Sequence, residues 1–266
     1  FCNCSSPKSG GSISLNGNLK LVVARSYFRG CFSGEFGGGI YSVSIGNSVS
    51  LSCFVECSAA DSTDDSGHGA YLACMSSNQE TSFSQGSVTL CPIVGIGADS
   101  CVYSKTSTEQ VSGSNFTQNM VRAYEIFQTN CETNLPLVLT SFVNCTSSCI
   151  ITSSDYVPIE MSIFVLNPRN WIRGGILNLV NGGEISDTIF FANSQAKFFN
   201  SASATVRSCI FCKNEFDPPI GTEDCDSFTV RRVVLLELCW IDHSYLFSTN
   251  NQQLSLWQLL ICFLLL

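Results

Sequence analysis

The sequence has little charge and very little histidine. Only 13% of its 266 residues are Asp, Glu, Lys or Arg, and its two histidines are His68 and His243. The 13 basic residues are outnumbered by 21 acidic ones, so the attraction to phosphate that drives most non-specific nucleic-acid binding is missing. We therefore expect no nucleic acid among the partners.

The common signatures of catalysis are also missing. The chain contains no Gly-x-Ser-x-Gly, no phosphate-binding Walker loop and no dinucleotide fingerprint. Two histidines leave little material for a nucleophile–histidine pair, and the Gly-rich segments are typical of turns. We predict that the protein is not an enzyme, with no catalytic residues and no cofactor-binding residues.

Paired Cys-x-x-Cys units of a zinc ribbon are absent, although the chain has 16 cysteines. The nearest approach is Cys209 and Cys212, followed at wider gaps by the lone Cys225 and Cys239, so we predict no metal site. This many cysteines favours an oxidising compartment.

Both ends of the sequence lack a complete targeting signal. The first residues, from Phe1 to Cys4, show neither an initiator Met nor a signal peptide, so we expect a fragment or a processed form without its N-terminal cap. Residues 254–266 (LSLWQLLICFLLL) are apolar, but as a helix they would cover only about 20 Å of a roughly 30 Å hydrocarbon core. This segment is either the start of a transmembrane helix or an amphipathic element packed on the domain.

A repeat of Phe, two variable residues and then Asn or Cys runs along the chain. It accounts for ten of the 19 phenylalanines, namely Phe1/Cys4, Phe28/Cys31, Phe54/Cys57, Phe116/Asn119, Phe127/Asn130, Phe142/Cys145, Phe164/Asn167, Phe190/Asn193, Phe211/Asn214 and Phe247/Asn250. We take Phe83 as a degenerate copy and Phe127 as an extra one. Successive copies then follow at about 20 to 35 residues, a period typical of a solenoid.

The residues around each copy indicate strands and turns. Polar and apolar residues alternate before the phenylalanines, as in Leu139–Phe142, and no helical stripe is sustained. Gly-rich corners lie between copies at Phe36–Tyr41, Gly67–Tyr71 and Arg173–Leu177, each followed by a new β run.

This pattern predicts an all-β fold, a right-handed parallel β-helix of about ten coils over residues 1–253. In such a stack equivalent residues lie about 4.8 Å apart, so Phe rings form an interior column and turn amides bond to the next amide along the axis. A small thiol fits the same ladder position. The cysteines are therefore either free ladder residues or disulfide-bonded, two alternatives that the sequence leaves equal.

The combination of Phe-x-x-Asn with Gly-Gly-x-Ile resembles the repeats of the polymorphic outer membrane protein (Pmp) family and of Cys-rich protist surface proteins. The resemblance extends from Phe1/Cys4 to Phe247/Asn250. It implies a right-handed parallel β-helix, like that of pectate lyases, displayed outside the cell. It also implies adhesion or surface variation without a catalytic site.

One acidic stretch, Asp61–Gly69, invites a catalytic interpretation. Polygalacturonases are β-helices that use an Asp pair and a Gly-His-Gly, here resembled by Asp64, Asp65 and the segment around His68. Those groups should come from different coils, whereas here they are adjacent. The carboxylates of Asp61, Asp64 and Asp65 could also bind Ca²⁺, but the spacing of a dedicated loop is missing. We predict a solvated acidic loop.

The sequence thus predicts a non-enzymatic cell-surface repeat protein acting in adhesion or surface display. Its partners would be host or matrix surface proteins or glycans, and the full-length protein would be extracellular and anchored in the membrane. The alternative is a carbohydrate-active β-helix enzyme, a polysaccharide lyase or glycoside hydrolase, which would need three or more carboxylates converging from different coils. A third possibility is a degenerate relative with no binding role.

Overall fold

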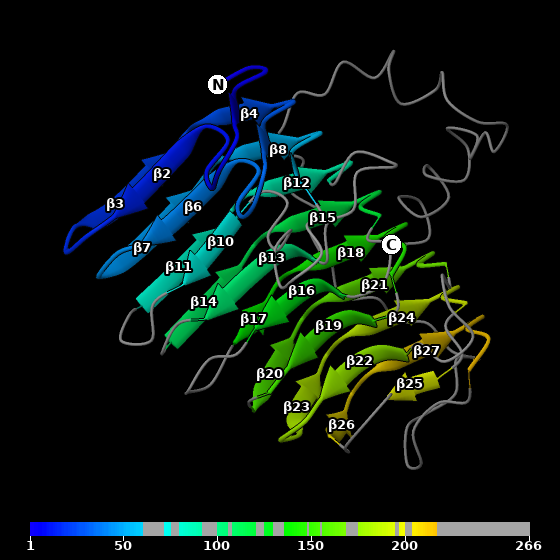
Figure 1. The fold of residues 1–266 in the computed structure, drawn as a ribbon. Coiled ribbons are helices and arrows are strands. Elements are labelled where there is room, and N and C mark those ends of the chain that lie inside the picture. The colour runs from blue at the N-terminus through cyan, green and yellow to red at the C-terminus, as the bar shows by residue number, and fades with distance from the viewer. Residues whose placement is uncertain are drawn as a thin grey trace, which may run out of the picture.

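The protein is built from short strands that stack in parallel (Figure 1). The computed structural model describes residues 1–60, 72–75, 80–91, 100–105, 108–120, 125–129, 136–147, 149–154, 156–168, 175–194, 197–199 and 204–216. Within these ranges there is no helix, and every strand pairs in parallel with its neighbours. The expected all-β parallel solenoid is confirmed.

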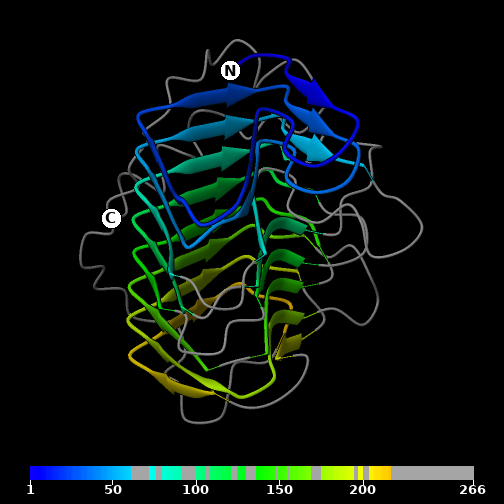
Figure 2. The same cartoon turned by 60° about the vertical axis from the view of Figure 1, so that its left-hand side comes forward.

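Three eight-stranded sheets form the walls of the solenoid (Figure 2). Sheet I consists of β2 (Ile13–Asn16), β6 (Ile40–Val43), β10 (Leu72–Met75), β13 (Ser100–Lys105), β16 (Glu125–Thr129), β19 (Cys149–Ser153), β22 (Gly175–Leu179) and β25 (Lys197–Phe199). Sheet II consists of β3 (Lys20–Ala24), β7 (Gly46–Ser50), β11 (Glu80–Ser84), β14 (Thr108–Ser112), β17 (Leu137–Val138), β20 (Val157–Glu160), β23 (Gly183–Ser186) and β26 (Thr205–Arg207).

Sheet III carries the phenylalanine repeat. It consists of β4 (Tyr27–Arg29), β8 (Cys53–Val55), β12 (Ser87–Thr89), β15 (Asn115–Thr117), β18 (Ser141–Val143), β21 (Ile163–Val165), β24 (Ile189–Phe191) and β27 (Ile210–Cys212). A small fourth sheet joins β1 (Ser5–Ser6), β5 (Phe32–Ser33) and β9 (Ser58–Ala59).

The chain visits sheets I, II and III in turn before it starts the next coil. Eight strands per sheet therefore correspond to eight coils in the described residues, fewer than the ten expected. The expected count gave a coil each to Phe1, which lies in a partial rung, and to Phe247, which is outside the described residues. At the N-terminal end the segment from Phe1 to Ser6 adds a partial rung, bridging Cys2 to Arg29.

The rings of the sheet III phenylalanines form one interior column. Each ring is the centre of a three-residue strand, so it points inward while its two neighbours point outward. Phe28 and Phe54 stack at 4.5 Å between ring centroids, and Phe164 and Phe190 stack at 4.9 Å. These rings are fully buried. The predicted phenylalanine column is confirmed.

In the third coil, the ring that fills the phenylalanine column comes from sheet II instead of sheet III. Phe83, expected to be a degenerate copy of the repeat, lies in β11 of sheet II, where it pairs with Val49 and Val111. The repeat position of this coil is held by Val88, which pairs with Phe54 and Phe116. The Phe83 ring nevertheless occupies the gap, tilted and 6.1 Å from the Phe116 centroid. The expected copy at Phe83 was therefore wrong about the strand, but its ring does lie in the phenylalanine column.

Phe127 is not a copy of the repeat either. It lies in β16 of sheet I, where it pairs with Val102 and Ile151. A Phe-x-x-Asn match cannot distinguish a sheet III strand from a sheet I strand, because apolar residues also align in register along sheet I, as Val102 and Ile151 do with Phe127.

Left-handed residues bound every sheet III strand. They lie three positions before the central residue, where Leu51, Leu139 and Met161 have φ near +50°, and two positions after it. The second group includes Glu56, Asn144 and Lys213. These paired bends let a strand of only three residues form one wall of the coil. Most are not glycine, so each carries backbone strain on the order of 1 kcal/mol.

The Gly-rich corner before β6 is confirmed at Phe36–Tyr41. Gly37 has φ +64°, and Ile40 begins the strand. The backbones of successive coils meet here, since a Cβ on Gly11 would lie 2.1 Å from the Gly38 carbonyl oxygen. The segment Gly67–Tyr71 lies outside the described residues, and Gly175 is itself the first residue of β22.

Candidate functional site

The position three residues after the central Phe forms a hydrogen-bonded ladder along the axis. Asn193 Nδ2 donates to the Phe164 carbonyl oxygen of the preceding coil at 2.9 Å. The backbone N–H of Asn167 donates to Asn193 Oδ1 at 3.1 Å, and Asn193 N–H repeats the contact with Asn214 at 3.0 Å. The predicted amide ladder is confirmed.

Cysteines occupy the same ladder positions and make the same two contacts. Cys145 Sγ donates to the Phe116 carbonyl oxygen at 3.4 Å, and Cys91 Sγ accepts from the Cys57 N–H at 3.2 Å. The thiol therefore replaces the asparagine amide as donor and as acceptor. Burial raises the pKa of Cys145 to about 12, so this thiol keeps its proton at neutral pH.

Most cysteines with described side chains form no disulfide. These are Cys2, Cys4, Cys31, Cys57, Cys91, Cys101, Cys145, Cys149, Cys209 and Cys212. Cys53 is disulfide-bonded, and its partner lies outside the described side chains. Both alternatives left open by the sequence thus occur in one chain, with the ladder cysteines Cys31, Cys57, Cys91 and Cys145 on the free side.

A second ladder, of hydroxyl groups, was missed by the sequence analysis. The residue two positions before the central Phe is Ser26, Ser52, Ser114, Thr140, Ser162 or Thr188 in six of the coils. Its hydroxyl accepts from the backbone N–H of the preceding coil, as in Ser162 N–H to Thr188 Oγ1 at 3.3 Å. The recurrence of Ser or Thr two residues before Phe was the available signal.

The outer face of sheet II presents the most regular array of polar side chains. Register aligns Ser48 with Ser82 and Gln110, and Ser50 with Ser84 and Ser112. We call these six residues the serine face. Five of them are half-buried and Gln110 is exposed, while the alternate residues, such as Val49 and Val111, are buried in the core. Ser82 Oγ donates to Ser48 Oγ at 3.2 Å.

The six residues of the serine face are uncharged and form an extended array, and the exposed Glu80 precedes Ser82 by two residues in the same strand. Its side chains repeat every coil, about 4.8 Å along the axis, and every second residue across it. Neutral hydroxyls and an amide both donate and accept hydrogen bonds, so the face can contact a repeating polar ligand at several equivalent points.

Farther along sheet II the outer face becomes charged. Glu160 on β20 and Glu184 on β23 come from successive coils, and Glu184 Oε1 lies 3.3 Å from Arg207 Nη1 of β26. Two carboxylates from different coils thus share this face, and one of them is paired with a guanidinium. Within the described ranges this falls short of the three converging carboxylates that the enzyme alternative requires.

The residues that the sequence suggested as possible metal ligands either lie apart or fall outside the described residues. Cys209 points into the wall, where Sγ donates to the Arg207 carbonyl oxygen at 3.2 Å, whereas Cys212 flanks the inward Phe211 and points outward. In the described part of the chain no three His, Cys, Asp or Glu residues come together as a possible metal site. His68, His243, Cys225, Cys239 and the acidic residues Asp61, Asp64 and Asp65 lie outside the described residues.

The apolar segment 254–266 also lies outside the described residues. Among those described, no helix has the length and hydrophobicity needed to cross a membrane. Compared with models of protein families, with curated proteins and with solved structures, the chain matches none.

Proposed function

We propose that this protein is a non-enzymatic cell-surface repeat protein that acts in adhesion or surface display. The observation that carries the proposal is the serine face, a continuous lateral surface whose side chains recur in register over successive coils. A surface of this kind offers contact area to an extended partner and does not concentrate chemistry at one point.

The ladders inside the solenoid should make it rigid, so that it can present the serine face to a partner. The Phe column and the Asn/Cys ladder join each coil only to its neighbours, as in other solenoids. We take the coil to be right-handed, since crossovers between parallel strands overwhelmingly are. The likeness of these repeats to those of the Pmp family and of Cys-rich protist surface proteins also supports this proposal.

Glycans are the partner class that the serine face fits best, with matrix proteins second. Ser48, Ser82 and Gln110 offer neutral donors and acceptors in one row, matching the hydroxyl and amide groups of a polysaccharide. No charged group belongs to the serine face, so salt should weaken this binding only slightly.

The proposed location is the exterior of the cell, with residues 254–266 beginning a membrane anchor in the full-length protein. The disulfide at Cys53 supports an oxidising compartment, where such bonds form and persist. The free thiols of Cys31, Cys57, Cys91 and Cys145 are compatible with it, because they are fully buried.

Protease shaving of intact cells tests the location. The full-length protein carries an epitope in the segment Asp61–Asp65, and a cytosolic protein carries the same epitope as a control. Loss of the epitope from the repeat protein alone supports display. Protection of both epitopes, with Cys53 reduced, would overturn it and leave an internal scaffold.

A further inference from the structure

Four successive rungs carry cysteine at the ladder position. Cys4, Cys31, Cys57 and Cys91 are aligned because Phe32 N–H donates to the Cys4 carbonyl oxygen and Ser58 N–H to that of Cys31, both at 2.9 Å. The next rung has Asn119, which accepts from Cys91 N–H at 2.9 Å. The N-terminal end of the ladder is therefore a column of thiols, whereas the later rungs are mostly amides.

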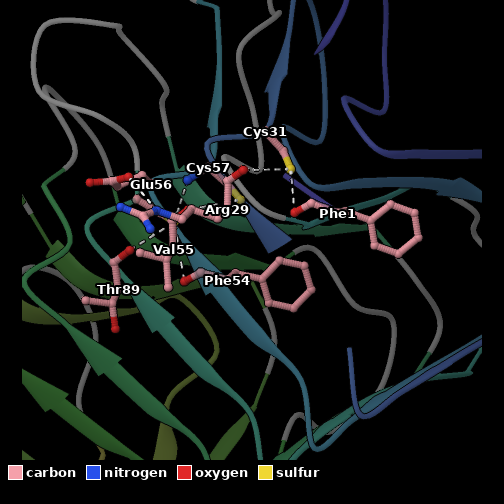
Figure 3. A network of polar contacts seen from close by, with 9 residues as sticks. Phe1, Arg29, Cys31, Phe54, Val55, Glu56, Cys57 and Thr89 are labelled. Carbon is pink, nitrogen blue, oxygen red and sulfur yellow. Dashed lines mark hydrogen bonds and ion pairs between the residues drawn. The ribbon is translucent and has the colours of Figure 1, made fainter. Parts of the chain in front are cut away.

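The spacing of this column matches that of a disulfide. Neighbouring parallel strands lie about 4.8 Å apart, and bridged cysteines have Cα atoms about 4.4 to 6.8 Å apart. Figure 3 shows Cys31 and Cys57 on adjacent rungs, with Cys31 Sγ directed at the Phe1 carbonyl oxygen, 3.9 Å away, on the side of the first rung. An asparagine at these positions could make the hydrogen bonds but could not be cross-linked.

Access to solvent distinguishes one pair within the column. Cys4 is partly exposed, whereas Cys31, Cys57 and Cys91 have no exposed surface. An oxidant in solution can reach Cys4 without opening the solenoid, and Cys31 is the thiol stacked beneath it. The pair Cys4 and Cys31 is thus the only one in this column with a direct route to solvent.

We propose that Cys4 and Cys31 form a disulfide between the first two rungs when the protein meets a low-molecular-weight disulfide. The Cys4 thiolate attacks one sulfur of the small disulfide, forms a mixed disulfide and releases one small thiolate. That thiolate takes the proton of Cys31, whose sulfur then attacks the Cys4 sulfur and displaces the second small thiolate, which takes up the proton that Cys4 had lost. One small disulfide is reduced to two thiols as two protein thiols are oxidised to one disulfide.

The bond would join the segment Phe1–Ser6 covalently to the coil below it. In the described residues β1 pairs with β5 only, and the Cys2–Arg29 bridge is isolated. A covalent link from Cys4 to Cys31 restricts the separation of this rung from the coil below. The Phe32 amide reports on that separation directly, because its hydrogen bond to Cys4 breaks when the rung opens.

The test uses the full chain with its Cys53 disulfide intact, incubated with glutathione disulfide. Peptide mapping by mass spectrometry under non-reducing conditions should find a cross-linked pair that contains Cys4 and Cys31. Hydrogen exchange at the Phe32 amide should slow by about tenfold after oxidation.

Three variants separate this bond from other oxidation. Cys4→Ser and Cys31→Asn, the latter keeping the ladder hydrogen bonds, should abolish both the cross-link and the slower exchange. Cys2→Ser removes an exposed neighbouring thiol and should leave both unchanged. A cross-link to Cys2, or a Cys4 that stops at the glutathione adduct, would overturn the proposal.

Discussion

At the residue scale, three positions of the third coil carry side chains that differ in size from those at the same positions in other coils. Phe83 takes a place that holds Val49 and Val111 in the adjacent coils, and Val88 takes the place of a phenylalanine. Gly86 lies beneath the ring, where a Cβ would be 2.3 Å from the Phe83 Cζ atom. The other coils have mostly Ser or Thr at this position, so the displaced ring fits only because Gly86 lacks a side chain.

This exchange predicts strong coupling between Phe83 and Val88. Phe83→Val leaves a cavity and should cost about 3 kcal/mol, while Val88→Phe overpacks the column and should cost about 2 kcal/mol. The double variant restores the regular column, so its unfolding free energy should lie within about 1 kcal/mol of the wild type. Denaturant unfolding of all four proteins measures the coupling.

The matched control exchanges the equivalent pair in the next coil. Val111→Phe with Phe116→Val should show no rescue, because Ser114 has a side chain where Gly86 has none. Additive losses in the third coil would show that the Phe83 ring does not share the column.

Backbone strain at the left-handed positions gives a second prediction. Leu139 has φ +53° and its side chain is 48% exposed, so it loses little packing on truncation. Leu139→Gly should stabilise the protein by about 1 kcal/mol, since glycine adopts this conformation without strain. Val138→Gly, one residue earlier in β17, should instead destabilise it by about 1 kcal/mol. Thermal unfolding distinguishes the two, and a loss of stability in Leu139→Gly would contradict the account.

At the element scale, the ladder explains why Asn and Cys alternate at one position. Either side chain accepts from the N–H of one rung and donates to the Phe carbonyl oxygen of that same preceding rung. The requirement is hydrogen-bonding geometry in a buried column, which a small amide and a thiol both meet.

Substitution in two adjacent rungs tests this equivalence. Asn167→Ala leaves the Cys145 N–H unpaired in the core and removes a donor from the Phe142 carbonyl oxygen, so it should cost about 3 kcal/mol. Cys145→Asn supplies the same contacts from an amide and should leave stability within about 1 kcal/mol of the wild type. Chemical denaturation compares them, and an equal loss in both variants would show that the position is set by size alone.

The sequence could predict those parts of the fold that repeat in every coil. The Phe column and the Asn ladder recur at fixed offsets, so composition and spacing revealed them. The sequence did not predict the third coil correctly, because its ring enters the column from sheet II. This compensation depends on tertiary packing and leaves no local signal at Phe83. The serine face was not predicted either, since Ser48 and Ser82 become neighbours only through the register of strands 34 residues apart.

At the scale of the whole molecule, several protonated thiols lie in the core. Burial raises the pKa of Cys145 to about 12 and that of Cys209 to about 11, from an ordinary value of 9.0. A raised pKa in the folded state means that the folded protein holds the proton more tightly than the unfolded chain does. The stability due to these thiols is therefore complete below pH 9 and is lost as the pH rises toward 12.

Thermal unfolding as a function of pH checks this prediction. The melting temperature of the wild type should show no thiol-linked change below pH 8 and should fall between pH 9 and 11. Cys145→Asn removes one such thiol while keeping its hydrogen bonds, so its melting temperature should fall less steeply. Parallel curves for the two proteins would show that Cys145 makes no contribution.

The proposed function makes the serine face the surface of contact. Beads carrying the full chain are tested for binding to immobilised matrix polysaccharides. The variant Ser50→Lys/Ser82→Lys disrupts this face, and Tyr27→Lys/Thr117→Lys makes the same charge change on the outer side of sheet III. We predict at least about tenfold weaker binding for the first variant and near wild-type binding for the second. Equal binding by the two variants, or no binding by the wild type, would contradict the account.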